Sequence, residues 1–238
     1  YKLFFTCGDK RSNYLCISDD KGENIIQKPL PCSVHGNEVG RATGDRLIYK
    51  NGRLCFGSQT AGIIYSEDMG ESWQSIDLYG EKNISLIWTD SEGKIFIAGC
   101  SGEANSPDGV TRGHTLYCST DGLKSFVPLT APDPVKYENS SYYGFVPQRI
   151  TSDSRYIYIT FASSGKVFYG GMGAYACDTG SLSGGKVYRY SIENGVPVFD
   201  TDITPEDDTF CGYSGICSNG KMLLLSTVCR KNGGDMIY

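Results

Sequence analysis

The sequence predicts an all-β chain that folds into β-propeller blades, each a four-stranded antiparallel sheet with Asp-box hairpins. Three observations predict this fold. Short apolar strands recur behind polar turns, a second polar turn motif recurs at intervals of about 50 residues, and no helical period persists along the 238 residues. Repeated units made only of short strands are typical of propellers, in which each unit is one blade.

The first repeated element is a polar turn followed by a short apolar strand. Its copies occupy residues 51–57, 92–98, 153–159 and 219–225, and residues 2–6 resemble a fifth copy without its turn. The strands open on basic residues, namely Lys2, Arg53, Lys94, Arg155 and Lys221. Asn51-Gly52 and Asn219-Gly220 indicate hairpin turns, because both residues of such a pair tolerate positive φ. The repeat predicts about five blades.

The second repeated element is the eight-residue Asp-box pattern S-x-D-x-G-x-x-W. Residues 66–73 match it at every fixed position, and these positions are Ser66, Asp68, Gly70 and Trp73. The copy at 18–25 keeps Ser18, Asp20 and Gly22 but ends in isoleucine. These two copies start 48 residues apart, as expected for consecutive blades.

A third copy at residues 119–126 is less regular. It keeps Ser119 and Asp121, carries its glycine one place early and ends in Phe126. It starts 53 residues after the second copy. A fourth unit, 186–191, stands where a further box is expected but lacks the motif.

The residue types of this motif suit a turn. Short serine and aspartate side chains hydrogen-bond the backbone amides of tight turns, and glycine adopts conformations that other residues resist. We expect the terminal aromatic side chain to enter the apolar layer between neighbouring sheets. The boxes are therefore predicted to stabilise the fold and to take no part in catalysis.

Composition excludes several classes of function. The net charge of −5 leaves no basic face for phosphates, so a dedicated nucleic-acid-binding protein is not expected. No apolar run approaches the roughly 18–20 residues needed to cross a membrane. His35 and His114 are isolated, and no C-x-x-C pair occurs among the ten cysteines. We therefore expect no cofactor and no metal site.

The ten cysteines leave two interpretations open. Several lie inside apolar runs, which favours buried free thiols. The alternative is a set of disulfides in a secreted protein. The chain opens directly on an apolar stretch after Tyr1, and its last residues resemble the strand before a box. We therefore expect residues 1–238 to be a partial propeller domain of about five blades, truncated at both ends.

Residues 36–47 read GNEVGRATGDRL, and residues 56–73 contain an apolar run that leads into the intact Asp box. In sequence and in order, both segments resemble glycoside hydrolase family 74, the xyloglucanases. Further matches follow the family's order at 146–149, 156–160, 185–190, 202–205 and 212–238. The resemblance thus covers almost the whole chain, and its specificity lies in the order of the motifs.

The resemblance implies a parent with two seven-bladed propellers and a glucan-binding cleft between them. It implies inverting hydrolysis of a β-1,4-glucan backbone, most of all xyloglucan, by two aspartates that both lie outside this chain. We therefore expect no catalytic residue here and an inactive isolated fragment. The implied partners are a polysaccharide substrate and a second propeller of the same parent. A polymeric substrate implies an extracellular enzyme.

Aromatic residues of the cleft wall are the expected contribution of this chain, because tyrosine and tryptophan stack on the apolar faces of sugars. The candidates are Trp88, Tyr142, Tyr143, Tyr169 and Tyr175. Each could instead pack inside or between blades.

Two features bear on details of the resemblance. Asp45 stands where the family has glutamate, beside Arg41 and Arg46, and is expected to form ion pairs. Residues 229–233 lack the tandem tryptophans of many members, which puts processive action in doubt.

Two other functions compete with the xyloglucanase hypothesis. One is a non-catalytic Asp-box propeller that binds carbohydrate or protein. The other is a sialidase, which requires an arginine triad and an R-I-P segment that this sequence does not show. The residues that flank this chain in its parent would discriminate among them.

Overall fold

The structure, a computed structural model, describes residues 2–8, 13–31, 47–58, 61–78, 84–100, 116–129, 145–163, 167–169, 175–177, 186–206 and 213–227. These segments consist of β-strands and their turns and contain no helix. In particular, they contain no helix that is long and apolar enough to span a lipid bilayer. The all-β prediction is confirmed.

Within the described residues, five sheets follow one another and a two-stranded hairpin forms a sixth, and every strand pair among them is antiparallel. Sheet 1 contains β1 (Leu3–Gly8), β2 (Asn13–Ser18) and β3 (Ile26–Pro29). Sheet 2 contains β4 (Leu47–Lys50), β5 (Arg53–Gly57), β6 (Ile63–Ser66) and β7 (Gln74–Ile76). Sheet 3 contains β8 (Ile84–Thr89), β9 (Phe96–Cys100), β10 (Leu116–Ser119) and β11 (Val127–Leu129).

Sheet 4 contains β12 (Phe145–Ser152), β13 (Tyr156–Ser163), β16 (Lys186–Glu193) and β17 (Val196–Asp202). Sheet 5 contains β18 (Tyr213–Ser218) and β19 (Leu223–Thr227). A separate hairpin of β14 (Val167–Tyr169) and β15 (Tyr175–Cys177) is inserted between β13 and β16. Each of sheets 2, 3 and 4 has four strands in sequence order, as expected for propeller blades.

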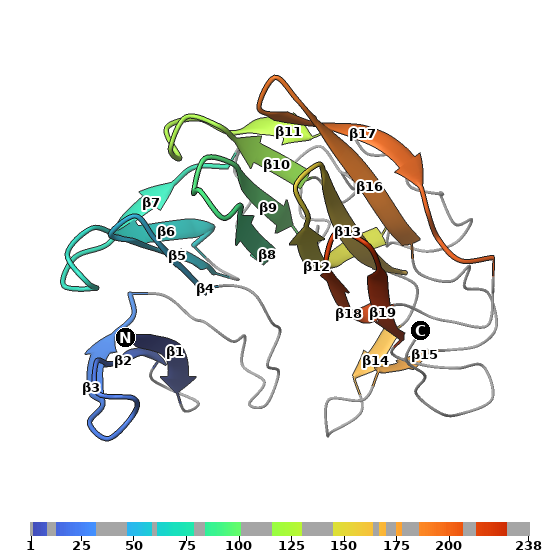
Figure 1. Ribbon diagram of the computed structural model, residues 1–238. Coiled ribbons are helices and arrows are strands. Elements are labelled where there is room, and N and C mark those ends of the chain that lie inside the picture. Colours follow the sequence, from blue (N-terminus) through green and yellow to red (C-terminus); the bar gives the residue numbers. More distant parts are fainter. Residues whose placement is uncertain are drawn as a thin grey trace, which may run out of the picture.

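The sheets are arranged radially. Figure 1 shows them fanned in an arc, with β1, β4, β8, β12 and β18 at the inner edge and β3, β7, β11 and β17 at the outer edge. The strand β4 contacts β1 and β8, and β12 contacts β8 and β18, so consecutive sheets meet through their inner strands. This order is that of propeller blades around an axis.

The hydrophobic core lies between the sheets. One apolar cluster joins sheets 1 and 2 and includes Leu15 and Phe56, and a second joins sheets 2 and 3 and includes Cys55 and Phe96. A third joins sheets 3 and 4, and a smaller fourth joins Val187 of sheet 4 to sheet 5. Because neighbours along a strand point to opposite faces, Cys55 and Phe56 serve two different clusters. The strand β5, the second of its sheet, is therefore buried on both faces.

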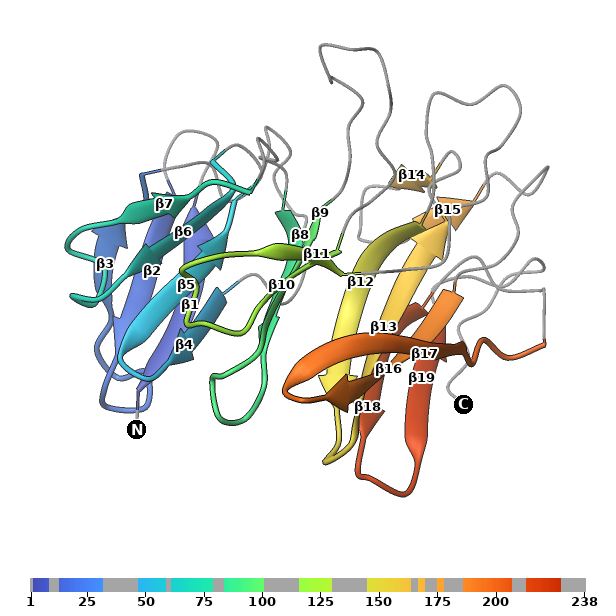
Figure 2. The ribbon, with the colours of Figure 1, turned by 90° about the horizontal axis from the view of Figure 1, so that it is seen from above.

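Because neighbouring strands run in opposite directions, successive connections lie alternately at one end of a sheet and at the other. Turns that join the first strand to the second, and the third to the fourth, share one end, which we call the turn end. The β13–β16 connection, with its β14–β15 hairpin, lies at the opposite, connection end. Figure 2 shows this hairpin beyond the ends of β12 and β13, far from the turn that joins them.

The Asn-Gly turns differ in detail. At the β4–β5 turn Asn51 and Gly52 have φ of 51° and 80°, as the sequence predicts for a two-residue hairpin. The β18–β19 turn is longer, and in it Gly220 has φ of 80° while Asn219 accepts hydrogen bonds from the amides of Lys221 and Met222. The asparagine side chain there acts as a turn acceptor instead of adopting positive φ.

Among the described cysteines, Cys55 and Cys118 are buried free thiols. Burial raises the pKa of Cys55 to about 12 and that of Cys118 to about 11. Both side chains therefore act as small apolar groups in the clusters between sheets.

Candidate functional site

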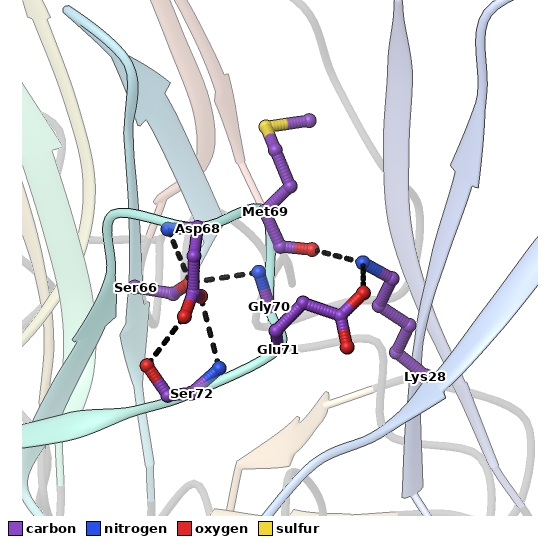
Figure 3. A network of polar contacts seen from close by, with 7 residues as sticks. All are labelled: Lys28, Ser66, Asp68, Met69, Gly70, Glu71 and Ser72. Atoms are coloured by element: carbon purple, nitrogen blue, oxygen red, sulfur yellow. Dashed lines mark hydrogen bonds and ion pairs between the residues drawn. The ribbon is translucent and has the colours of Figure 1, made fainter.

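The three Asp boxes form turns with one hydrogen-bond pattern, at β2–β3, β6–β7 and β10–β11. In the second, drawn in Figure 3, Ser66 Oγ donates to Asp68 Oδ1 at 2.8 Å and accepts from the Gly70 amide at 2.7 Å. Asp68 accepts from the Ser72 amide at 2.9 Å and from the Ser72 hydroxyl. The Ser66 hydroxyl and the Asp68 carboxylate thus accept the hydrogen bonds that Gly70 and Ser72 donate within the turn.

The other two box turns repeat these contacts. In the first, Ser18 Oγ accepts from the Gly22 amide at 2.7 Å, and Asp20 accepts from the Asn24 amide at 2.9 Å. In the third, Ser119 Oγ accepts from the Leu123 amide at 3.1 Å, and Asp121 accepts from the Ser125 amide at 3.0 Å. The three serines, Ser18, Ser66 and Ser119, are buried.

Two consecutive left-handed residues explain the misplaced glycine of the third box. The pairs are Lys21 and Gly22, Met69 and Gly70, and Gly122 and Leu123, and their φ values range from 59° to 97°. Since glycine relieves strain at either position, a box works with glycine first or second. In the third box Leu123 takes the second position and buries its side chain between sheets 2 and 3.

The last residue of the second box and that of the third box pack toward the preceding sheet. Trp73 packs against the cluster between sheets 1 and 2, and Phe126, only 5% exposed, belongs to the cluster between sheets 2 and 3. Ile25, the last residue of the first box, is 50% exposed. The box turn therefore joins a hairpin to an interface between blades.

The box carboxylates are held in their ionised form. Hydrogen bonds from the backbone and side chain of Asn24 lower the pKa of Asp20 to about 2. The side chain and backbone of Ser125 lower the pKa of Asp121 to about 2, and the equivalent bonds from Ser72 place the pKa of Asp68 far below its usual range. A general acid in glycoside hydrolysis needs a raised pKa, so these aspartates do not suit that role.

Acid should therefore weaken the box turns. Because the folded pKa values lie below the unfolded value of about 3.9, the stabilisation is fully present above about pH 4 and is lost as pH falls through about 2. We expect the thermal midpoint to fall less steeply between pH 5 and 2 in a variant with Asp20→Asn, Asp68→Asn and Asp121→Asn. Replacement of the exposed neighbour Asp19 by asparagine is the control. If the thermal midpoint of the triple variant falls with pH as steeply as that of the wild type, the three carboxylates do not stabilise the box turns as described.

The structure separates the candidate sugar-binding residues. Trp88 lies on β8 next to the turn end, opposite Ile97 of β9, and packs partly buried against the cluster between sheets 3 and 4. Tyr169 and Tyr175 are direct register partners in the β14–β15 hairpin at the connection end. Tyr142 and Tyr143 lie outside the described residues. Trp88 and the hairpin tyrosines are thus at opposite ends of the sheets.

Two cations that the sequence does not reveal hold the box turns to the preceding sheet. Lys28 of β3 donates to the Met69 carbonyl at 2.9 Å and to Glu71 at 2.7 Å, as Figure 3 shows. Arg53 of β5 donates to the Gly122 carbonyl at 2.7 Å, pairs with Glu67 and stacks 5.1 Å from the Tyr65 ring centroid. These partners lie 41 and 69 residues away, so no local pattern predicts them.

Several known xyloglucanases are similar to this chain over most of its length. No family model matches the chain. It is 24% identical over 241 residues to the oligoxyloglucan-reducing end-specific xyloglucanase of Emericella nidulans, which covers 91% of the chain and 28% of that protein. The resemblance to glycoside hydrolase family 74 is confirmed.

Two solved structures of family 74 agree. The GH74 enzyme of Niastella koreensis matches 95% of the chain with a TM-score of 0.66 and 22% identity, over 32% of its own length. The GH74 xyloglucanase of Xanthomonas campestris matches 100% of the chain with a TM-score of 0.67 and 20% identity, over 34% of its length. The β-propeller fold class is thereby confirmed. The chain spans about a third or less of the length of these relatives.

Some motifs of the family 74 resemblance lie outside the described residues. They include 36–46, with Arg41, Asp45 and Arg46, and 229–233, where many members carry tandem tryptophans. The similarity at residues 61–73 falls on β6 and the second box turn. The expected ion-pair role of Asp45 stays a prediction.

Proposed function

We propose that this chain is part of a glycoside hydrolase that cleaves the β-1,4-glucan backbone of xyloglucan. The observation that carries the proposal is the similarity to a xyloglucanase over 91% of the chain, since a fold alone would not indicate a substrate. The parent enzyme acts on a polysaccharide too large to enter a cell, so we propose an extracellular location.

We propose that residues 1–238 form part of a seven-bladed ring that faces a second propeller of the same parent. Among the described residues, the first and the last of the five sheets each pack against another sheet on one face only, which supports a larger ring. Phe5 of sheet 1 is 40% exposed, Leu224 of sheet 5 is 45% exposed, and Met222 in the β18–β19 turn is 60% exposed. Such faces are covered in a propeller, because closure removes exposed sheet surface.

The cleavage itself is assigned to two aspartates outside this chain, as the family resemblance implies. Inverting hydrolysis needs one carboxylic acid that protonates the leaving oxygen and one carboxylate that activates water, roughly 6.5–9.5 Å apart. The lowered pKa values of Asp20, Asp68 and Asp121 argue against a general-acid role for these three residues, because a general acid needs a raised pKa.

For this chain we propose a share of the sugar-binding surface at the connection end. Tyr169 and Tyr175 are direct register partners in the β14–β15 hairpin, and tyrosine is a residue type that stacks on the apolar faces of sugars, so we assign both residues to this surface. Tyr142 and Tyr143 stay candidates for the same surface. Trp88 is the weakest of the five, because it packs against the apolar cluster between sheets 3 and 4.

The parent is expected to release reducing sugar from tamarind xyloglucan, whereas the isolated chain is expected to release none. A parent with Tyr169→Ala and Tyr175→Ala should show a KM raised about tenfold or more, since two stacked rings at about 0.5–1.5 kcal/mol each together contribute about 1–3 kcal/mol. The matched control is Tyr49→Ala, an exposed tyrosine of β4. Absence of release by the parent would remove the proposed substrate, and a KM unchanged by the double substitution would remove the hairpin surface.

A further inference from the structure

Two box turns receive a cation at the same backbone atom. Lys28 Nζ reaches the Met69 carbonyl oxygen, and Arg53 Nη1 reaches the Gly122 carbonyl oxygen. Met69 and Gly122 are both the fourth residue of their box and the first of its two left-handed residues. In each contact the cation comes from the preceding sheet.

The carbonyl, and not the cation, is the constant partner in this contact. Lys28 lies on the outermost strand of sheet 1, whereas Arg53 lies on the second strand of sheet 2. Two different strands and two different side chains thus supply the same charge to the same atom. A hydrogen bond from a charged donor is roughly twice as strong as a neutral one, and both side chains are 30% exposed or less, which limits competition from water. The box turn therefore offers a defined acceptor to the neighbouring blade.

The first box turn has the same backbone but lacks this contact within the described part of the chain. Lys21 is its fourth residue, with φ of 65°, and none of the described side chains donates to the Lys21 carbonyl. Ile25 of the same turn is 50% exposed, although Phe126 at this position in the third box is buried between sheets. Phe4 packs toward sheet 2, so its neighbour Phe5, 40% exposed, lies on the opposite face.

We propose that this face of sheet 1, formed by Phe5, Ile25 and the Lys21 carbonyl, docks another β-sheet of the parent that presents a lysine or arginine to the carbonyl. The argument is continuity with the interfaces between sheets 1 and 2 and between sheets 2 and 3, where the equivalent carbonyl binds Lys28 or Arg53. The inference rests on the proposed function, in which the arc is part of a larger ring, and it names the chemistry that the neighbouring blade supplies.

A photo-crosslinking experiment on the parent tests this proposal. The photoreactive residue p-benzoylphenylalanine replaces Lys21, and in a matched control it replaces Met69, whose cross-link should capture the peptide that contains Lys28. With the probe at position 21 we expect an intramolecular cross-link to one strand that contains a lysine or arginine. Replacement of that basic residue by methionine should lower the cross-link yield at least threefold and lower the thermal unfolding midpoint, and we expect the same loss of thermal stability from Lys28→Met.

The outcomes separate this proposal from the proposed function. Capture of a second parent molecule, capture of a segment without a basic residue, or no capture while the Met69 probe reacts would each overturn the docking proposal. The cross-link is read without substrate, and xyloglucan hydrolysis is measured separately on the parent without a probe. A parent that forms the cross-link but does not cleave xyloglucan would therefore overturn the proposed function alone.

Discussion

Replacement of Ile157 by alanine is expected to lower the free energy of unfolding by about 2–5 kcal/mol, as large-to-small substitutions in a packed core do. Ile157 lies on β13, is fully buried, and belongs to the cluster that joins sheet 4 to sheet 3. The substitution removes three carbon atoms from a layer that two blades share. Urea unfolding of the isolated chain, or of the parent where the chain does not fold alone, measures the loss.

Val198→Ala is the control for this substitution. Val198 lies on β17, the outermost strand of the same sheet, and is 40% exposed. A surface change of this kind is expected to stay within about 0.5 kcal/mol of the wild type. Similar losses at Ile157 and Val198 would contradict a core that lies between sheets.

Replacement of Gly70 by alanine is expected to lower the free energy of unfolding by about 2–5 kcal/mol, the sum of backbone strain and overpacking. Gly70 has φ of 84°, and a Cβ atom there would lie 2.8 Å from Leu15 Cδ2 of sheet 1. Leu15 is fully buried and has little room to move. The substitution therefore damages both the box turn and the interface between sheets 1 and 2, which the unfolding free energy reports.

Gly122→Ala separates these two effects. Gly122 has φ of 76°, but a Cβ atom there would have no neighbour within 4 Å among the described residues. We expect only the strain of a left-handed alanine, about 1–2 kcal/mol. Equal losses of unfolding free energy for Gly122→Ala and Gly70→Ala would mean that the close approach of Gly70 to Leu15 adds nothing to the cost. That result would contradict the overpacking that we expect at Gly70.

The local elements of this fold were largely predictable from the sequence. Strand positions followed from apolar runs bounded by turn residues, and the Asn51-Gly52 hairpin followed from the tolerance of both residues for positive φ. The similar turn at Asn194-Gly195, which replaces the missing box of sheet 4, was not identified, although its sequence signal is the same. The glycine shift of the third box became intelligible only when the structure showed two consecutive left-handed residues.

Contacts between blades were not predictable from the sequence, because they join residues that lie far apart in the chain. Nothing near Lys28 or Arg53 indicates the carbonyl that each binds, and the repeated basic residues at strand starts gave no partner. The sugar-binding site was harder to predict than the contacts between blades. Aromatic residue type suggested Trp88 as well as Tyr169 and Tyr175, but only strand direction shows that Trp88 lies near the turn end and the hairpin at the connection end.

We propose that this arc of blades supports a sugar-binding surface while the cleaving groups lie elsewhere in the parent. A crystal structure of the parent with a bound xyloglucan oligosaccharide would show both features at once. We predict sugar at the connection end of these sheets, with the scissile bond between two aspartates outside residues 1–238. A scissile bond beside Asp20, Asp68 or Asp121, or sheets 1 to 5 without radial order, would contradict the account.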